Sequence, residues 1–130
     1  MKPGAINHQP WHFIDVLPTL AAVAGATPPA GCAGENMTPM LAGRKVKRRP
    51  LFWEHEGSRA VRDGKWKLTA VHPGGKWELY DIEADRSELH DLAASYPDRV
   101  RRLAVQWERW AKQNNVIPWI WDPPYPASSV

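Results

Sequence analysis

The feature that most constrains this chain is a series of four short strand-like segments, separated by turn signals, between residues 50 and 81. They occupy residues 51–55, 58–62, 65–71 and 76–80. Asp63-Gly64 lies between the second and third segments and is a strong two-residue hairpin signal. Residues 72–75 (HPGG) turn the chain before the fourth. Because every connection is short, the pattern predicts a four-stranded antiparallel sheet.

A helix-like segment follows the predicted sheet and can cover one of its faces. Its apolar residues recur at helical spacing over about four turns: Val100, Leu103, Ala104, Trp107, Trp110 and Ala111. Ser95 is the expected N-cap, Pro97 falls in the first turn, and the helix should end near Asn114. A sheet covered by this helix gives a small α+β unit over residues 44–130.

The first third of the chain shows less pattern. Residues 12–14 are predicted to end a strand, and Asp15 to cap a helix over residues 15–24. A single helical turn is expected at residues 38–41. Gly, Pro and basic residues dominate the rest of residues 26–49, so we expect a boundary here, between parts 1–43 and 44–130.

Composition argues against several classes of partner. The formal charge is only +3, and the basic run at residues 44–49 (RKVKRR) occupies one linker, so a solvated linker is favoured over a nucleic-acid surface. No apolar run approaches the roughly 20 residues that span a bilayer. Cys32 is the single cysteine, so no internal disulfide forms and cysteine usage assigns no compartment.

Most residues with reactive side chains have a simpler interpretation. Cys32 lies in a Gly-rich loop with no base nearby in sequence, which favours an incidental thiol over a nucleophile. Asp81, Glu83 and Asp85 resemble a calcium loop only superficially, because the required glycine and the closing Glu are missing. A solvated acidic turn is the favoured interpretation.

The segment Glu54-His55-Glu56 is the most interesting polar cluster. A His between two carboxylates at the end of a strand suits acid/base chemistry or an oriented binding group. Arg59 and Arg62 on the next strand could hold an anion. From the residues alone, a polar strand end is the favoured interpretation of Glu54-His55-Glu56, and arginines on the solvent face of a strand are as ordinary as an anion site.

Four segments, in order along the chain, resemble motifs of the type I sulfatase (arylsulfatase) family. They are residues 15–20 (DVLPTL) with Ala24-Gly25, residues 36–43 (NMTPMLAG), residues 51–68 (LFWEHEGSRAVRDGKWKL), and residues 78–81 (ELYD) with 88–93 (ELHDLA). Each segment is weak evidence by itself. Together they cover nearly the whole chain in the family's order, and the chain resembles the carboxy-terminal portion of such an enzyme.

The resemblance implies an architecture and a candidate site. Residues 1–43 would end an alkaline-phosphatase-like α/β catalytic domain, with helix 15–24 as part of it, and residues 44–130 would be its carboxy-terminal subdomain. Glu54, His55 and Arg59 match a segment that approaches the active-site rim in arylsulfatases. They are therefore the candidate substrate-binding residues.

The same resemblance predicts that these 130 residues carry no catalysis of their own. The family needs a Cys or Ser in a C/S-x-P-x-R motif, matured to formylglycine, and an Asp/Asn cluster that binds calcium. Cys32 is followed by Ala-Gly-Glu-Asn and does not match. We assign no catalytic residue and no metal ligand here, and expect formylglycine and calcium in a full-length parent.

Two functional interpretations remain open beside a purely structural one. The chain is expected to be a fragment of a sulfate-ester hydrolase, inactive alone, or a binding or complementation module for a sulfated glycan or a separate sulfatase chain. Without a large domain, helix 15–24 would lack a partner and could self-associate. Neither nucleic acid nor a membrane is an expected partner.

Overall fold

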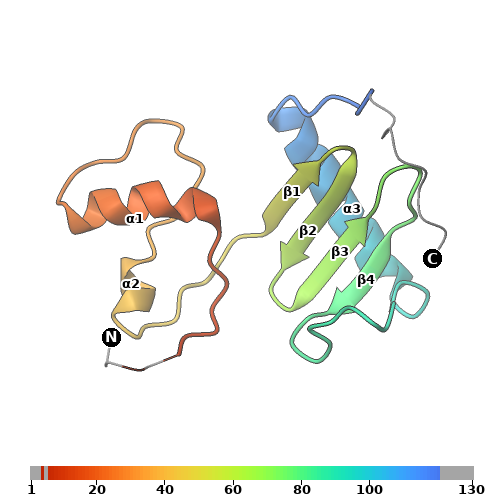
Figure 1. Cartoon of the computed structure of the whole chain (residues 1–130), viewed down its shortest axis with the longest axis horizontal. Coiled ribbons are helices and arrows are strands. Elements are labelled where there is room, and N and C mark those ends of the chain that lie inside the picture. The colour runs from red at the N-terminus through yellow and green to blue at the C-terminus, as the bar shows by residue number, and fades with distance from the viewer. Residues whose placement is uncertain (1–3, 5, 121–130) are drawn as a thin grey trace. The chain divides into compact units, whose positions relative to one another are not determined.

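The computed structural model describes residue 4 and residues 6–120, and the chain divides into two compact units. The first is Met1–Arg49 and the second is Pro50–Val130 (Figure 1). The basic run at residues 44–49 therefore belongs to the first unit. Residues 121–130 of the predicted carboxy-terminal part lie outside the described residues.

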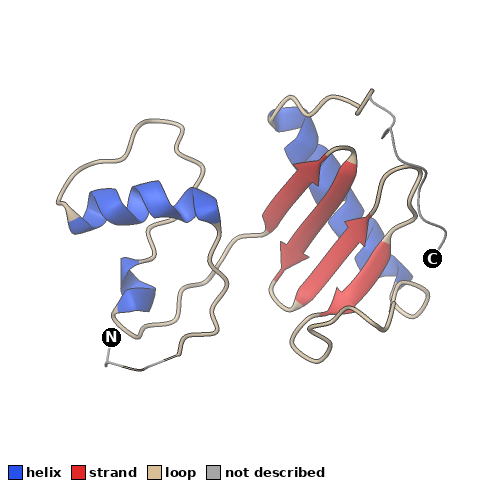
Figure 2. Ribbon diagram, in the orientation of Figure 1, coloured by secondary structure: helices blue, strands red, loops and turns tan. Residues whose placement is uncertain are grey.

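The second unit is an antiparallel sheet with a helix across one face (Figure 2). Its strands are β1 (Leu51–His55), β2 (Ser58–Asp63), β3 (Trp66–Ala70) and β4 (Glu78–Asp81), in the order β1-β2-β3-β4. Helix α3 spans Pro97–Gln113. The predicted α+β fold is confirmed, because each short connection joins neighbouring strands and the apolar stripe of α3 covers the sheet.

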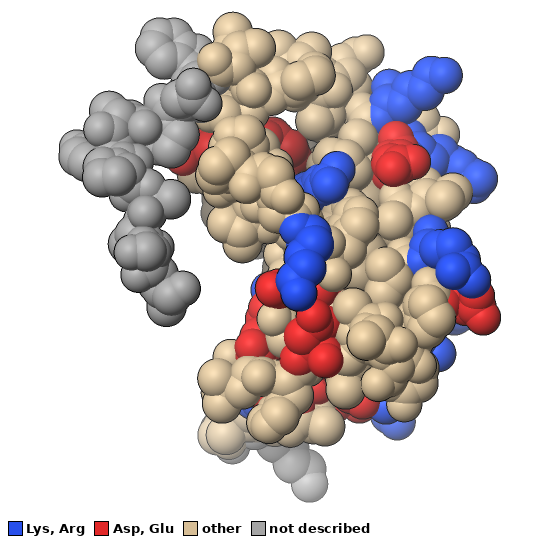
Figure 3. Space-filling view, turned by 90° about the vertical axis from the view of Figure 1, so that its right-hand side faces the viewer, with Lys and Arg blue, Asp and Glu red and all other residues tan. Residues whose placement is uncertain are grey.

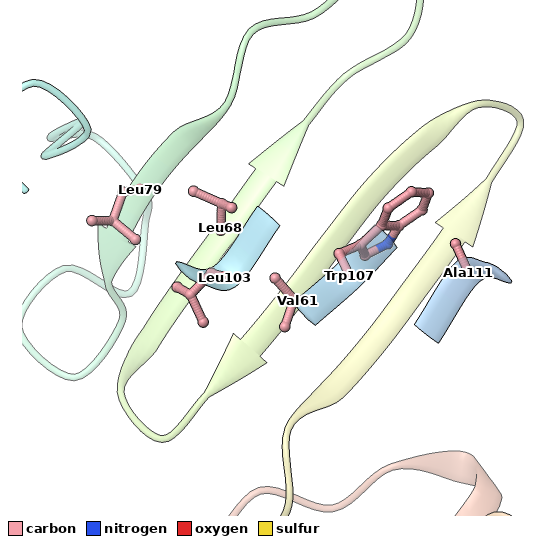
Figure 4. Packing of buried hydrophobic residues seen from close by; sticks show 6 residues of the cluster. All are labelled: Val61, Leu68, Leu79, Leu103, Trp107 and Ala111. Atoms are coloured by element: carbon pink, nitrogen blue, oxygen red, sulfur yellow. The ribbon is translucent and has the colours of Figure 1, made fainter. Parts of the chain in front are cut away.

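The core of this unit lies between the sheet and α3 (Figure 4). Strands β2, β3 and β4 contribute Val61, Leu68 and Leu79, each with no exposed surface. Three residues of α3, four positions apart, meet them: Leu103, Trp107 and Ala111. Such spacing places all three on one face of the helix. Full burial of an aliphatic side chain contributes about 1.5–3 kcal/mol, so these contacts dominate the stability of the unit.

The turn between β2 and β3 lies one residue later than predicted. Asp63 pairs with Trp66 across the hairpin, which leaves Gly64-Lys65 as the two-residue turn. Gly64 has a φ of +61°, a conformation that glycine adopts without strain. Asp63 stays in the ladder, and its carboxylate pairs with Arg102 of α3 at 3.1 Å.

The start of α3 differs from the prediction of Ser95 as N-cap. The N-cap is Tyr96, with no side-chain capping bond, and Pro97 follows in the first turn. Ser95 instead belongs to the preceding turn, where its N–H donates to the Leu92 carbonyl at 3.0 Å. The Tyr96 ring packs against Trp66 with 5.2 Å between centroids, and this tertiary contact fixes the helix entry.

The sheet face opposite α3 contains one buried phenol. Tyr80 neighbours Leu79 on β4 and therefore points away from the helix. It is only 7% exposed, and its hydroxyl donates to Glu78 Oε2 at 3.0 Å. Burial, helped by the Glu78 carboxylate, raises the pKa of Tyr80 to about 12.

The first unit contains a short 3-10 helix, η1 (Phe13–Asp15), followed by α1 (Val16–Val23) and α2 (Thr38–Leu41). The predicted helix and the predicted single turn are confirmed, within one residue at each end of α1. The strand predicted at residues 12–14 is wrong. His12 Nδ1 accepts from the Ile14 N–H, and Asp15 Oδ2 accepts from the His12 N–H at 2.8 Å. These reciprocal bonds close a helical turn.

Asp15 is the N-cap residue of α1, as predicted, but its side chain makes no capping hydrogen bond to that helix and organises the first unit instead. Its fully buried carboxylate accepts from the Glu35 N–H at 2.9 Å and lies 2.8 Å from Arg48 Nη2. Burial opposes ionisation, but the N–H groups of Glu35 and His12, together with Arg48, outweigh it and lower the pKa of Asp15. Asp15, the first residue of the sulfatase-like motif at residues 15–20, therefore connects the loop at Glu35 to the helix η1.

Candidate binding cavity

Strand register brings two of the three candidate residues together. Glu54 on β1 pairs directly with Arg59 on β2, so both side chains project to the face that α3 covers. His55 is the next residue on β1 and points to the opposite face, because successive side chains alternate along a strand. Glu54 and Arg59 therefore share a site that His55 does not enter.

Glu54 has a local role in the β1–β2 hairpin. Its Oε1 accepts from the Gly57 N–H at 2.9 Å, across a turn in which Glu56 and Gly57 have φ values of +50° and +79°. A Cβ at Gly57 would lie 2.7 Å from the His72 ring. Only glycine fits this left-handed position against the imidazole.

Arg59 is held by aromatic rings. Its Cζ lies 4.4 Å from the ring centroid of Trp77 and 5.6 Å from that of Trp107. Stacking on indole orients a guanidinium and leaves its edge N–H groups free to donate. In the described part of the chain, no carboxylate lies within ion-pair distance of Arg59, and its guanidinium makes no hydrogen bond.

These side chains line a cavity of about 460 Å³ between the hairpin end of the sheet, the end of α3 and the segment that follows it. Glu54, Arg59 and His72 form its polar part. Trp107 and Trp119 contribute indoles, and Ala70, Ala111, Val116, Ile117 and Pro118 add apolar surface. The cavity therefore combines one unpaired cation with aromatic and apolar walls.

Sequence reasoning predicted only Glu54 and Arg59 among the residues that line this cavity. His72 follows β3 and reaches the cavity only because the β3–β4 turn lies beside the β1–β2 hairpin. Trp107 and Trp119 were recognisable only as core and tail residues. The one available signal was strand alternation, which separates Glu54 and Arg59 from His55.

Arg62 does not complete a two-arginine anion site with Arg59. The two residues are three positions apart on one strand and therefore point to opposite faces. Arg62 Nε donates to the Gly64 carbonyl at 3.0 Å, and burial lowers the pKa of its guanidinium. Figure 3 shows that basic and acidic side chains are interspersed on the face that it draws.

The acidic turn after β4 uses its carboxylates internally. Asp81 Oδ2 lies 2.5 Å from Lys65 Nζ, which lowers the pKa of Asp81 and raises that of Lys65. Asp85 accepts from the His90 N–H at 2.8 Å, which lowers the pKa of Asp85. Among the described residues, no three His, Cys, Asp or Glu side chains gather as metal ligands.

A serine form of the sulfatase signature occurs elsewhere in the chain, around the start of α3. Ser95-Tyr96-Pro97-Asp98-Arg99 matches S-x-P-x-R letter for letter. In the structure these residues begin α3: Arg99 lies 4.3 Å over the Trp66 ring, and Asp98 pairs with Arg101. The segment has a structural explanation, so we assign it no catalytic role.

Two further properties of the described residues bear on function. None of their helices combines the length and apolar character needed to cross a membrane. Cys32 is a free, half-buried thiol in the loop between α1 and α2.

Comparison with known proteins gives the same family as the motifs. No protein-family model matches the chain. An uncharacterized sulfatase of Schizosaccharomyces pombe is 29% identical over 132 residues, which cover 90% of this chain and 24% of the relative. A Delta 4,5-hexuronate-2-O-sulfatase of Bacteroides thetaiotaomicron is 36% identical over 90 residues, which cover 62% of this chain and 19% of the relative.

The fold matches as well. The solved structure of a 2-O GAG sulfatase aligns with a TM-score of 0.66 and 29% identity, covering 84% of this chain and 27% of that one. The sheet, its covering helix and the sequence matches identify the homologues of this chain as members of the sulfatase family. The chain corresponds to the carboxy-terminal portion of these proteins, and it spans about a quarter of the length of the curated relatives it matches.

Proposed function

We propose that this chain is the carboxy-terminal portion of an arylsulfatase-like hydrolase of sulfate esters, and that these 130 residues hydrolyse no ester by themselves. The parent reaction converts a sulfate ester and water into an alcohol and sulfate. The observation that carries the proposal is the match to about a quarter of each sulfatase relative, over a sheet and helix that reproduce the fold. Formylglycine and calcium would belong to the remaining portion.

The surface of the first unit supports a sulfatase catalytic portion as the partner. Four apolar side chains of η1 and α1 are exposed: Phe13, Leu17, Leu20 and Val23, at 87%, 53%, 61% and 68%. An apolar helix face of this kind is typical of a docking surface. Because the relatives are about four times longer than the chain, we propose that this face packs against their amino-terminal portion.

Substrate contact is a second part of the proposal. Glu54, His55 and Arg59 remain the candidate residues, and the cavity that Glu54 and Arg59 line supports contact by these two. His55 would have to reach a substrate from the opposite face of the sheet. The 2-O-sulfatase relatives favour a sulfated sugar as the substrate class.

Mixing experiments test the proposal. Turnover of nitrocatechol sulfate is measured with calcium, for the chain alone and with a formylglycine-bearing amino-terminal sulfatase fragment. We expect activity only in the mixture. Turnover by the chain alone would contradict the proposed inactivity, and no activity in either case would contradict complementation.

A matched pair of variants tests the docking face. Leu20→Asp places a charge on the exposed face of α1, whereas Leu89→Asp changes a residue that is 76% exposed in the second unit. We expect Leu20→Asp to abolish activity of the mixture and Leu89→Asp to preserve it. Equal effects of the two variants would refute the assignment of α1 as the docking surface.

A further inference from the structure

The basic run at residues 44–49 ends the first unit, and one of its five cations is buried. The side chain of Arg48 is only 7% exposed, and Pro50 begins the second unit two residues later. The four exposed cations are Arg44, Lys45, Lys47 and Arg49. The solvated linker expected from the sequence therefore describes these four residues but not Arg48.

Arg48 is held by two carboxylates from other parts of the first unit. Its Nη2 lies 2.8 Å from Asp15 Oδ2, and its Nη1 donates to Glu35 Oε2 at 2.7 Å. The Asp15 side chain is 1% exposed and that of Glu35 is 26% exposed. Among the described residues, Nε and Nη2 of Arg48 have no aligned hydrogen bond, so its burial depends on the two carboxylates. Loss of one partner from a buried ion pair is strongly destabilising.

The start of the run is held by the side-chain amide of Gln9. Its Oε1 accepts from the Val46 N–H at 2.6 Å, and its Nε2 donates to the Arg44 carbonyl at 3.1 Å. These two bonds bind the backbone on either side of Lys45. Proteins commonly recognise an extended peptide through its main-chain N–H and C=O groups. A protease would therefore compete with Gln9 for the same backbone groups.

We propose that residues 44–49 are a protected processing site for an endoprotease that cleaves after Lys or Arg. The exposed cations supply the side chains that such a protease recognises, and nicking is concentrated in irregular segments of this kind. The contacts of Gln9 and Arg48 protect the backbone until they open. Water then adds across one peptide bond, the C–N bond breaks, and the products are a carboxylate on the upstream piece and an amine on the downstream piece. This inference goes beyond the proposed function and does not depend on it.

Limited digestion of the purified chain with trypsin tests the protection. Mass spectrometry measures the rate of cleavage within residues 44–49, and a synthetic peptide of residues 40–54 gives the rate for the same bonds without the fold. Because Pro50 follows Arg49, the bond between them is not a reporter. We expect cleavage of the chain to be at least about 10-fold slower than cleavage of the peptide, since cleavage follows the population of the open form. Equal rates would overturn the protection.

Glu35→Gln tests the Arg48 contact and keeps every cleavage site of the run. We expect its cleavage within residues 44–49 to be about 10-fold faster than in the unaltered chain, the change that corresponds to loss of a charge-assisted hydrogen bond. Glu108→Gln is the matched control, because it makes the same change at an exposed glutamate of α3. Equal rates for the two variants would refute the role of Arg48.

Gln9→Ala is the second variant, and it should also accelerate cleavage by about 10-fold. Gln113→Ala, at an exposed glutamine at the end of α3, is its control. Labelling of Cys32, a half-buried thiol of the first unit, reports unfolding of that unit. Faster cleavage with an unchanged labelling rate supports local opening of the run. If cleavage accelerates only together with labelling, unfolding of the whole unit controls it, and the proposal is overturned. Absence of cleavage within residues 44–49 in both variants would overturn the assignment of the site.

Discussion

Truncation of Leu103 at the centre of the α3–sheet contact should cost the second unit a large share of its stability. Leu103 has no exposed surface and packs against the strand residues of the core. Leu103→Ala removes three carbon groups, at about 0.8 kcal/mol each, and leaves a cavity behind. We expect a loss of about 3–4 kcal/mol, against a total of about 5–15 kcal/mol for a typical domain.

Urea unfolding followed by tryptophan fluorescence measures this loss. The signal reports the second unit, because every tryptophan except Trp11 follows residue 50. With a slope of about 1–1.5 kcal/mol per molar urea, the midpoint should fall by about 2–4 M. Val105→Ala is the matched control: Val105 is on the same helix but 53% exposed, so its loss should stay below about 0.5 kcal/mol. A loss below about 1 kcal/mol for Leu103→Ala, or losses of equal size, would refute the packing argument.

Three further predictions concern the turns and the buried phenol. Gly57→Ala should destabilise the unit by about 1–3 kcal/mol, measured by the same unfolding assay, because its φ is positive and the His72 ring occupies the space of a Cβ. Gly64→Ala should cost about 1 kcal/mol, because Gly64 also has a positive φ but has open space around its Cβ position. A larger loss of stability for Gly64→Ala than for Gly57→Ala would contradict the role of the His72 contact. Burial raises the pKa of Tyr80 to about 12, so its contribution to stability is fully present below pH 10, falls as pH rises above 10, and is lost once pH passes about 12. The free energy of unfolding of Tyr80→Phe should lack this decrease as the pH rises above 10. Ser95→Ala should leave the activity of the complemented mixture unchanged, since this residue belongs to the turn before α3. Complete loss of that activity would indicate that Ser95 acts as the serine of an S-x-P-x-R motif.

The sheet was predictable because its signals are local. Alternation, short connections and turn residues specify strand pairing without reference to distant parts of the chain. The apolar stripe from Val100 to Ala111 likewise predicted both α3 and the face that it buries. Errors occurred where a tertiary contact overrode a local preference. Tyr96 takes the N-cap position predicted for Ser95 and packs against Trp66, and the Asp15 side chain, at the predicted N-cap of α1, pairs with Arg48 and makes no capping bond.

The sequence by itself determined the family, the strand order and the helix that covers the sheet, because motifs, turns and periodicity are properties of neighbouring residues. Only the tertiary structure decided which polar groups meet. Strand alternation could separate Glu54 and Arg59 from His55, but no local pattern could bring His72 and Trp119 to the same cavity. Those residues are close in space because β3, α3 and the segment after it end beside one hairpin, and that proximity depends on long-range packing.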